Sequence, residues 1–350
     1  MRHPAASRVV AVGDLHGDLA KSTRALRAAG VCDREGRWTG GAAVAVQVGD
    51  VMDRGGDEIA LLYWLERLQL EARRAGGDVV LLNGNHEFMA ASADVRYADP
   101  AAYDEFARWA VVRALEEALV GRCLRWEREE KEKKEHVVSR YRALSRDGRA
   151  ARNAALAPGS GELTLRFLTR RNVFAHVGST LFVHGGALPE HAEKGLEVIN
   201  QEAFDWLVGS HPPGGAPPPP PAPGTPKPAR LPPSLRGRSA PIWTRHIGHE
   251  DQSKCACDAL DALLGLERGA KRVVVGHTIQ DAGINSACQG KVYRIDVGLS
   301  KGCGDGTPAA LVIEADRWVA RAVEPTAAQT QTPAQSGPES KAARRVHVAA

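Results

Sequence analysis

The chain has 350 residues, of which 43% are hydrophobic, and this is enough apolar material for a large buried core. Its 46 Lys and Arg residues nearly balance 42 Asp and Glu residues, and no basic block is present, so nucleic acid is not expected as a partner. No apolar run approaches the roughly 20 residues of a membrane-spanning helix, and no charged-then-apolar leader precedes the first expected strand. We therefore expect a soluble intracellular protein without a membrane partner, assigned first to the cytosol, with organelle import left open.

Six cysteines are scattered along a chain that is far larger than the small secreted domains that depend on disulfides. Reduced thiols are therefore the expectation. The alternative is a regulatory disulfide among Cys257, Cys288 and Cys303, which follow one another near the C-terminal motifs described below. The sequence does not decide which of them would pair.

Strands and helices alternate at the start of the chain. Apolar runs at 9–12, 43–48 and 79–82 predict buried strands that end abruptly at polar turns. The segments 19–29 and 58–75 between them have helical spacing. This alternation predicts a largely parallel sheet, in which ligands bind at the carboxyl ends of the strands.

A highly charged helical segment follows, and we predict that residues 97–160 form an inserted helical cap. We expect its charged face to be solvated, with the docking of a regulatory protein as the alternative. Two short strands are predicted at 173–177 and 180–183. Proline and glycine dominate residues 211–233, which predicts a flexible loop, with a proline-rich ligand for another protein as the less favoured interpretation.

Three further strands, at 272–275, 291–297 and 309–314, are expected to complete the fold. The catalytic domain is predicted to span 8–323. Residues 326–350 are rich in Ala, Gln, Thr and Pro, and we expect them to be a disordered tail.

Five short polar motifs share one position, directly after an expected strand. They are Asp14 and His16 in GDLHG, Asp50 and Asp53 in GDVMDRGG, Asn85 and His86 in GNHE, His184 in HGG, and His277 in GHT. A lone aspartate at such a place usually caps the next helix, and a lone histidine is usually structural. Five motifs with oxygen and imidazole donors and no thiolate instead predict a site for two divalent cations, with Mn expected first and Fe or Zn as alternatives.

In their order and spacing, these motifs resemble the calcineurin-like metallophosphoesterases and, within them, the phosphoprotein phosphatase family. The resemblance runs from about residue 9 to residue 323 without the proline-rich loop. The segments 14–18, 38–41, 47–56, 83–87 and 276–285 look most like the Shewanella-like protein phosphatases. The resemblance implies an α/β sandwich of two mixed β-sheets flanked by helices, with the helical insertion on its surface.

The same resemblance implies a role for each matching residue. It assigns Asp14 and His16 to the first metal, Asn85, His184 and His277 to the second, and Asp50 to both. A hydroxide between the two cations would attack phosphorus in line, without a covalent phosphoenzyme.

The resemblance also implies that His86 protonates the leaving oxygen and that Asp53 orients its ring. Arg54 is expected to clamp phosphate oxygens with its planar guanidinium, and Arg245 is a second candidate for that role, a surface arginine being the alternative.

Two departures separate the chain from the classical serine/threonine phosphatases. Asn83 stands where they carry arginine, and RIDVG at 294–298 replaces their SAPNY-type loop, so their substrate preference and toxin sensitivity do not transfer. The Shewanella-like branch implies resistance to the classical toxins and a preference that could include phosphotyrosine. The expected substrate is thus a phosphoprotein or phosphopeptide, modified on Ser, Thr or Tyr.

Two other functions remain as alternatives. A small-molecule phosphoesterase, such as a dinucleoside polyphosphate hydrolase, shares the ligands at the strand ends, but Asp53 in the Asp-Arg-Gly triplet argues against it. A non-enzymatic scaffold that binds through the cap and the proline-rich loop is the other, and the intact set of predicted ligands argues against that.

Overall fold

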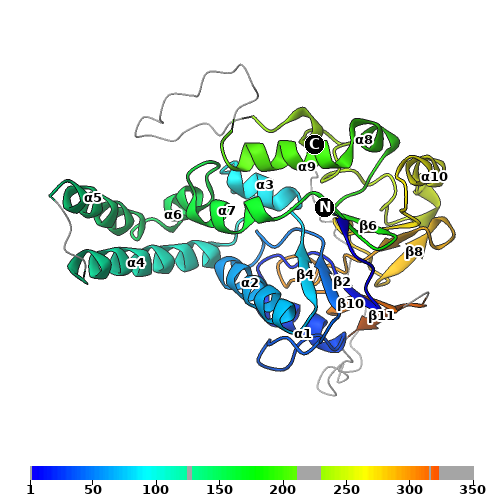
Figure 1. The fold of residues 1–350 in the computed structure, drawn as a ribbon, viewed down its shortest axis with the longest axis horizontal. Coiled ribbons are helices and arrows are strands. Elements are labelled where there is room, and N and C mark those ends of the chain that lie inside the picture. The colour runs from blue at the N-terminus through cyan, green and yellow to red at the C-terminus, as the bar shows by residue number, and fades with distance from the viewer. Residues whose placement is uncertain (1, 124–127, 211–229, 315–316, 323–350) are drawn as a thin grey trace, which may run out of the picture.

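Two mixed β-sheets form the centre of the computed structural model, which describes residues 2–123, 128–210, 230–314 and 317–322 (Figure 1). One sheet has the strand order β11 (Arg317–Ala322), β10 (Ala309–Glu314), β2 (Arg8–Val12), β3 (Val44–Gln47), β4 (Asp78–Leu81). The other has the order β1 (Arg2–His3), β5 (Phe174–Val177), β6 (Thr180–Val183), β7 (Arg272–Val275), β9 (Val292–Arg294), β8 (Asn285–Ala287).

Each sheet combines parallel and antiparallel pairs. Strands β2, β3 and β4 are parallel, while β10 runs antiparallel to both β2 and β11. In the other sheet, β6, β7 and β9 are parallel, and β5 and β8 run antiparallel to their neighbours β6 and β9. The expected α/β sandwich of two mixed sheets is therefore confirmed.

The strands read as continuous apolar runs because both of their faces are buried. In β2, Val9 and Ala11 belong to the core between the two sheets, whereas Val10 and Val12 belong to the core beneath the helices. Side chains alternate between the two faces of a strand, so a strand covered on both sides needs apolar residues at every position.

Helices cover the outer faces of the sheets. They are α1 (Leu19–Ala28), α2 (Glu58–Arg74), α3 (Asn85–Ala91), α7 (Glu162–Arg166), α8 (Pro189–Lys194), α9 (Leu196–Leu207) and α10 (Cys257–Leu266), with single 3-10 turns η1 (Leu168–Arg170), η2 (Pro233–Leu235), η3 (Gln252–Lys254) and η4 (Cys288–Gly290). Local sequence sets their starts: the Asp18 carboxylate accepts a hydrogen bond from the backbone N–H of Lys21 (2.9 Å) at the beginning of α1.

Three helices fall inside the predicted insertion of 97–160, namely α4 (Pro100–Cys123), α5 (Arg128–Leu144) and α6 (Gly148–Leu156). Helices α4 and α5 pack side by side and extend away from the sheets, and α6 returns toward α3 (Figure 1). The buried face of α6 consists of Ala151, Arg152, Ala155 and Leu156.

Some boundaries differ from those predicted. Strand β1 lies ahead of residue 8 and pairs with β5, so described structure begins before the predicted start of the domain. Strand β9 ends at Arg294 and not at 297, because the next residues form a turn in which the Asp296 carboxylate accepts the Gly298 N–H (2.8 Å). Most of the proline-rich segment (211–229) and all of the predicted tail lie outside the described residues. The predicted domain limits stay predictions.

One disulfide departs from the expectation of reduced thiols. It joins Cys257, the first residue of α10, to Cys288 in η4, with their Cα atoms 5.2 Å apart. Cys303, the third candidate, is a buried free thiol, as are Cys32 and Cys255.

Among the described residues, no helix combines the length and the apolar content that crossing a membrane requires.

Candidate metal centre

The six predicted metal ligands meet where the carboxyl ends of parallel strands from the two sheets come together. From one sheet, Asp14 and His16 follow β2, Asp50 follows β3, and Asn85 follows β4. From the other sheet, His184 follows β6 and His277 follows β7. The site therefore draws on both halves of the sandwich.

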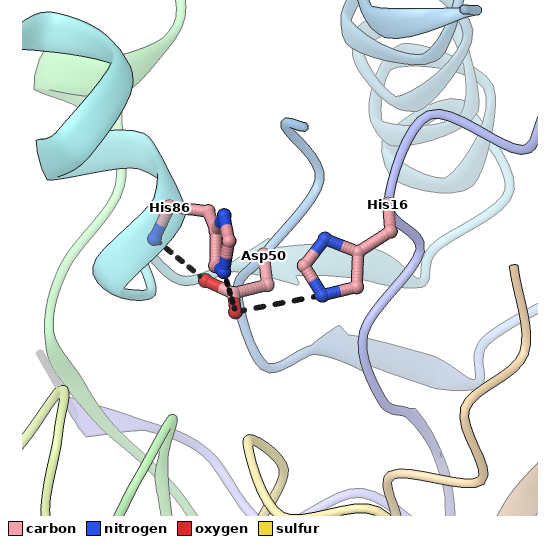
Figure 2. Close-up of side chains that lie close together, drawn as sticks. All are labelled: His16, Asp50 and His86. Atoms are coloured by element: carbon pink, nitrogen blue, oxygen red, sulfur yellow. Dashed lines mark hydrogen bonds and ion pairs between the residues drawn. The ribbon is translucent and has the colours of Figure 1, made fainter. Parts of the chain in front are cut away.

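Asp50 lies at the centre of this group. Its Oδ2 atom is 3.1 Å from Nε2 of His184 and 3.8 Å from Nε2 of His16. Its Oδ1 atom accepts the backbone N–H of His86 (2.9 Å), and the Nε2 atom of that residue lies 3.9 Å from Oδ2 (Figure 2). One carboxylate thus faces imidazoles on several sides.

Two groups of donor atoms in the described residues could each hold a cation. His16, Asp50 and His86 form one, Asp50, His184 and His277 form the other, and within each group the donor atoms lie within 4.8 Å of one another. Because both groups contain Asp50, they are consistent with a binuclear centre that shares this carboxylate.

The remaining two predicted ligands border these groups. Oδ2 of Asp14 is 3.9 Å from Nε2 of His16, and Oδ1 of Asp14 accepts the backbone N–H of His277 (3.1 Å). Oδ1 of Asn85 lies 2.9 Å from Nε2 of His184. In the first group His86 stands where the resemblance implies Asp14, so His86 is an additional nearby donor.

The charges in the site favour cations. Burial, together with the charges of Asp296 and Asp50, raises the pKa of Asp14 well above its usual value. Burial likewise raises the pKa of Asp296 to about 6. Buried carboxylates that repel one another are stabilised by a cation placed between them.

Two of the imidazoles, those of His16 and His277, favour the neutral form. Burial and the neighbouring His86 lower the pKa of His16 to about 4. Burial and then His184 and Arg245 lower the pKa of His277 well below its usual value. A neutral imidazole offers the lone pair that a metal ligand needs, so the residues present fit a pair of divalent cations.

The loops that carry the ligands have an unusual backbone. His16, Asp50, Asp53, Arg54 and His277 all have positive φ angles, between 42° and 67°. Such conformations are costly for residues other than glycine and persist where the surrounding structure holds them.

Glu87 stabilises the backbone of the loop after β3. Its carboxylate accepts backbone N–H groups from Asp50 (2.9 Å), Val51 (2.7 Å) and Gly84 (2.7 Å). Gly84 must be glycine, because a Cβ atom there would collide with the carboxylate of Asp50.

His86 and Asp53 form a buried pair beside the ligand groups. Nδ1 of His86 lies 2.6 Å from Oδ2 of Asp53, and the two residues are 5% and 0% exposed. Burial opposes a charge on the ring, but the carboxylates of Asp50 and Asp53 outweigh it and raise the pKa of His86. This ring therefore favours the protonated form more than a free imidazole does.

The two predicted phosphate-binding arginines lie at the rim. Arg54 is half-buried, its guanidinium is 4.8 Å from the centre of the Tyr97 ring, and its backbone N–H donates to the Tyr97 carbonyl (2.7 Å). The Tyr97 ring also lies 5.3 Å from that of His86. Arg245 is exposed, close enough to His277 to lower its pKa.

Sequence reasoning missed two residues that touch this site, Arg152 and Glu58. Arg152 Nη2 donates to Oδ1 of Asp53 (2.8 Å) and to Glu58 (2.9 Å), and all three side chains are 0% exposed. Glu58 reads as an ordinary acidic residue in the first turn of a helix. The only local signal for Arg152 was an arginine on the apolar face of a predicted helix.

Comparison with known proteins gives a consistent picture. Residues 7–281 match the family model of the calcineurin-like phosphoesterases. The chain is 44% identical to Shewanella-like protein phosphatase 2 of Arabidopsis thaliana, over 89% of this chain and 76% of that protein. It is 30% identical to an uncharacterised Schizosaccharomyces pombe protein, over 83% of this chain and 73% of that protein.

Among solved structures, the fold is similar to a cold-active protein-tyrosine phosphatase of a psychrophilic Shewanella species. The TM-score is 0.57 at 22% identity, and the match covers 91% of this chain and 78% of that structure.

Proposed function

We propose that this chain, a hydrolase, removes phosphate from phosphoserine, phosphothreonine or phosphotyrosine in proteins. The chain belongs to the calcineurin-like phosphoesterases and, within them, to the Shewanella-like protein phosphatases. The observation that carries this proposal is the shared Asp50, which faces imidazoles from both sheets beside the buried His86 and Asp53 pair. A phosphomonoester needs both parts, since its oxygens carry negative charge and its leaving oxygen needs a proton.

In this proposal Asp14 and His16 hold one divalent cation, Asn85, His184 and His277 hold the other, and Asp50 holds both. When bound, such cations withdraw electron density from phosphoryl oxygens and lower the pKa of water. Manganese is our first choice, with iron or zinc as alternatives, because the donors are oxygen and imidazole without thiolate.

His86 gives its Nε2 proton to the leaving oxygen, while Asp53 keeps Nδ1 bonded and the ring in orientation. The raised pKa of His86 supports this role, because an acid must carry its proton near neutral pH. Arg54 and Arg245 bind the phosphate oxygens and so position the phosphorus. The half-buried position of Arg54 next to Tyr97 supports its part, since its guanidinium is already restrained before substrate binds.

The regulatory partner and the cellular compartment of the protein stay predictions. A regulatory protein is proposed only at the helical insertion, since most of the proline-rich loop lies outside the described residues. The cytosol remains our prediction for the compartment.

The function is tested by turnover of four substrates after the metal has been removed and Mn, Fe or Zn restored. They are phosphoserine, phosphothreonine and phosphotyrosine peptides and a dinucleoside polyphosphate. We expect at least one phosphopeptide to be hydrolysed far faster than the dinucleotide. A preference for the dinucleotide would establish the small-molecule alternative. If a folded protein with both cations bound hydrolyses none of the four, a non-enzymatic scaffold is the remaining function.

A further inference from the structure

Arg152 is an arginine of the helical insertion whose side chain reaches the centre of the domain. It lies in α6 among Ala151, Ala155 and Leu156, and it is 0% exposed. Its Nε donates to Oε2 of Glu58 (2.8 Å), and its Nη2 is shared between Oε1 of Glu58 (2.9 Å) and Oδ1 of Asp53 (2.8 Å). One guanidinium therefore connects two buried carboxylates.

The carboxylate of Asp53 is divided between two partners. Oδ1 receives Arg152, and Oδ2 faces Nδ1 of His86 at 2.6 Å. The backbone N–H of Asp53 donates to Oε1 of Glu58 (2.8 Å), which holds the strained residue from the other side. Arg152 and Glu58 together thus set both the backbone and the side-chain orientation of Asp53.

A purely stabilising role would not require this arrangement. Removing one partner of a buried ion group is costly, but replacing the whole group with apolar side chains is often neutral, so stability alone does not account for it. The planar fork of arginine, in contrast, can fix two carboxylates in a set orientation. That orientation decides where Oδ2 meets the ring of His86.

We propose that Arg152 is a positioning residue for phosphoester hydrolysis, which holds the Asp53 carboxylate against His86 and so makes the helical insertion part of the active site. This proposal rests on the proposed function, because it assumes that His86 acts on the leaving group. Arg152 itself touches neither the candidate metal ligands nor the substrate region in any contact that the structure shows.

The test is Arg152→Lys, which keeps the positive charge but replaces the fork with a single ammonium group. Truncation to alanine would leave two buried carboxylates uncompensated and could unfold the protein. The matched control is Arg113→Lys, which makes the same change at another arginine of the insertion. Arg113 pairs with Glu162 of α7 (3.0 Å), away from His86 and Asp53. Circular dichroism and metal analysis of both variants verify that fold and cations are retained.

For Arg152→Lys we expect kcat on a phosphoserine peptide to fall by about tenfold to a hundredfold, part of the usual worth of a general acid. We expect kcat on p-nitrophenyl phosphate to fall by less than about threefold, since its phenolate leaves with little protonation, and KM to stay unchanged. Arg113→Lys should match the wild type on both esters.

A second readout does not depend on turnover. The short contact between Nδ1 of His86 and Asp53 predicts a strongly deshielded proton in the NMR spectrum of histidine-labelled protein, assigned by its loss in His86→Asn. This signal should move or broaden in Arg152→Lys and stay in place in Arg113→Lys.

Equal losses on the two esters together with an unchanged proton signal would overturn the positioning role and leave the proposed function intact. Wild-type activity in a folded Arg152→Lys variant would do the same. A wild-type protein that hydrolyses neither ester with its cations bound would overturn the proposed function, and with it this inference.

Discussion

At the scale of single residues, the charge balance of the centre depends most on Asp50. Its pKa is held well below the usual range, because His184 and His86 outweigh the effect of burial, so the carboxylate is charged and ready to bind cations. Asp14 lies at the edge of the same group, and its pKa is raised. The two aspartates should therefore differ in how much metal binding depends on them.

We expect Asp50→Asn to lower the metal content to less than one cation per chain, because the amide cannot neutralise two cations. Asp14→Asn, the matched change at a ligand assigned to one cation, should lose less. Metal analysis after dialysis measures both. Two cations retained by Asp50→Asn would contradict the shared assignment.

His86→Asn should lower kcat on a phosphoserine peptide by about 10²–10⁴-fold, the usual contribution of a positioned general acid. The loss on p-nitrophenyl phosphate should be much smaller, because its leaving group needs little protonation. Kinetics on both esters, with metal analysis beside them, provide the measurement. If both esters lose equally while both cations remain, His86 does not act as the acid.

The residues of the site differed in how readily the sequence revealed them. The candidate ligands could be recognised because each follows a strand end within a few positions, inside a short motif. Arg152 could not, because its contact with Asp53 spans 99 residues and lies within no motif. Glu58 was hidden by its resemblance to an ordinary acidic residue at a helix start.

At the scale of elements, the predicted strands and helices agree with the structure to within a few residues where apolar periodicity is strong. Strands β1, β8 and β11 were not predicted. The first two have only two or three residues, which carry no periodicity. Strand β9 was predicted too long, because an apolar run does not reveal that its end turns at Asp296.

One contact between helices should make stability depend on pH. Glu105 of α4 accepts the backbone N–H groups of Ile59 (2.7 Å) and Ala60 (2.9 Å) at the start of α2. Burial nevertheless raises its pKa from 4.5 to about 7. The folded state therefore binds this proton more tightly than the unfolded state, and the stabilisation is complete below pH 4.5 and is lost as the pH rises through 7.

Glu105→Gln removes this titration and should flatten the fall in unfolding free energy between about pH 4.5 and 7, by at most about 1.4 kcal/mol per pH unit for one proton. Denaturant unfolding at several pH values measures the slope. Asp104→Asn, an exposed neighbour on the same helix, is the control and should keep the wild-type slope. An unchanged slope in Glu105→Gln would mean that folding does not raise the pKa of the Glu105 carboxyl.

At the scale of the whole molecule, bound cations should stabilise the fold. A chelator should lower Tm, because it leaves the buried carboxylates of Asp14, Asp50 and Asp296 facing one another. Restored Mn should raise Tm as its concentration increases. Binding at one site should add about 2.7 kcal/mol to the free energy of unfolding when the Mn concentration is about 100 times Kd. Differential scanning calorimetry provides the measurement. A Tm that changes with neither treatment would contradict the proposal that this centre binds cations.

The architecture could be predicted at this scale because the motifs resemble one family, and their order implies the sandwich. The position of the insertion relative to the site could not be predicted in the same way. Helices α4 and α5 carry charged sequences without a shared motif, and only the packing of α6 beside α3 brings Arg152 into the core.

The candidate metal centre brings together residues from the beginning and the end of the domain. Asp14 accepts a hydrogen bond from the backbone of His277, 263 residues later, and the donors from β6 and β7 come only after the whole insertion. During synthesis, a ribosome releases the donors of one sheet long before those of the other. Of the six proposed ligands, a nascent chain that ends before β6 therefore holds four, Asp14, His16, Asp50 and Asn85. We expect hydrolytic activity to begin only after the segment around His277 has left the exit tunnel.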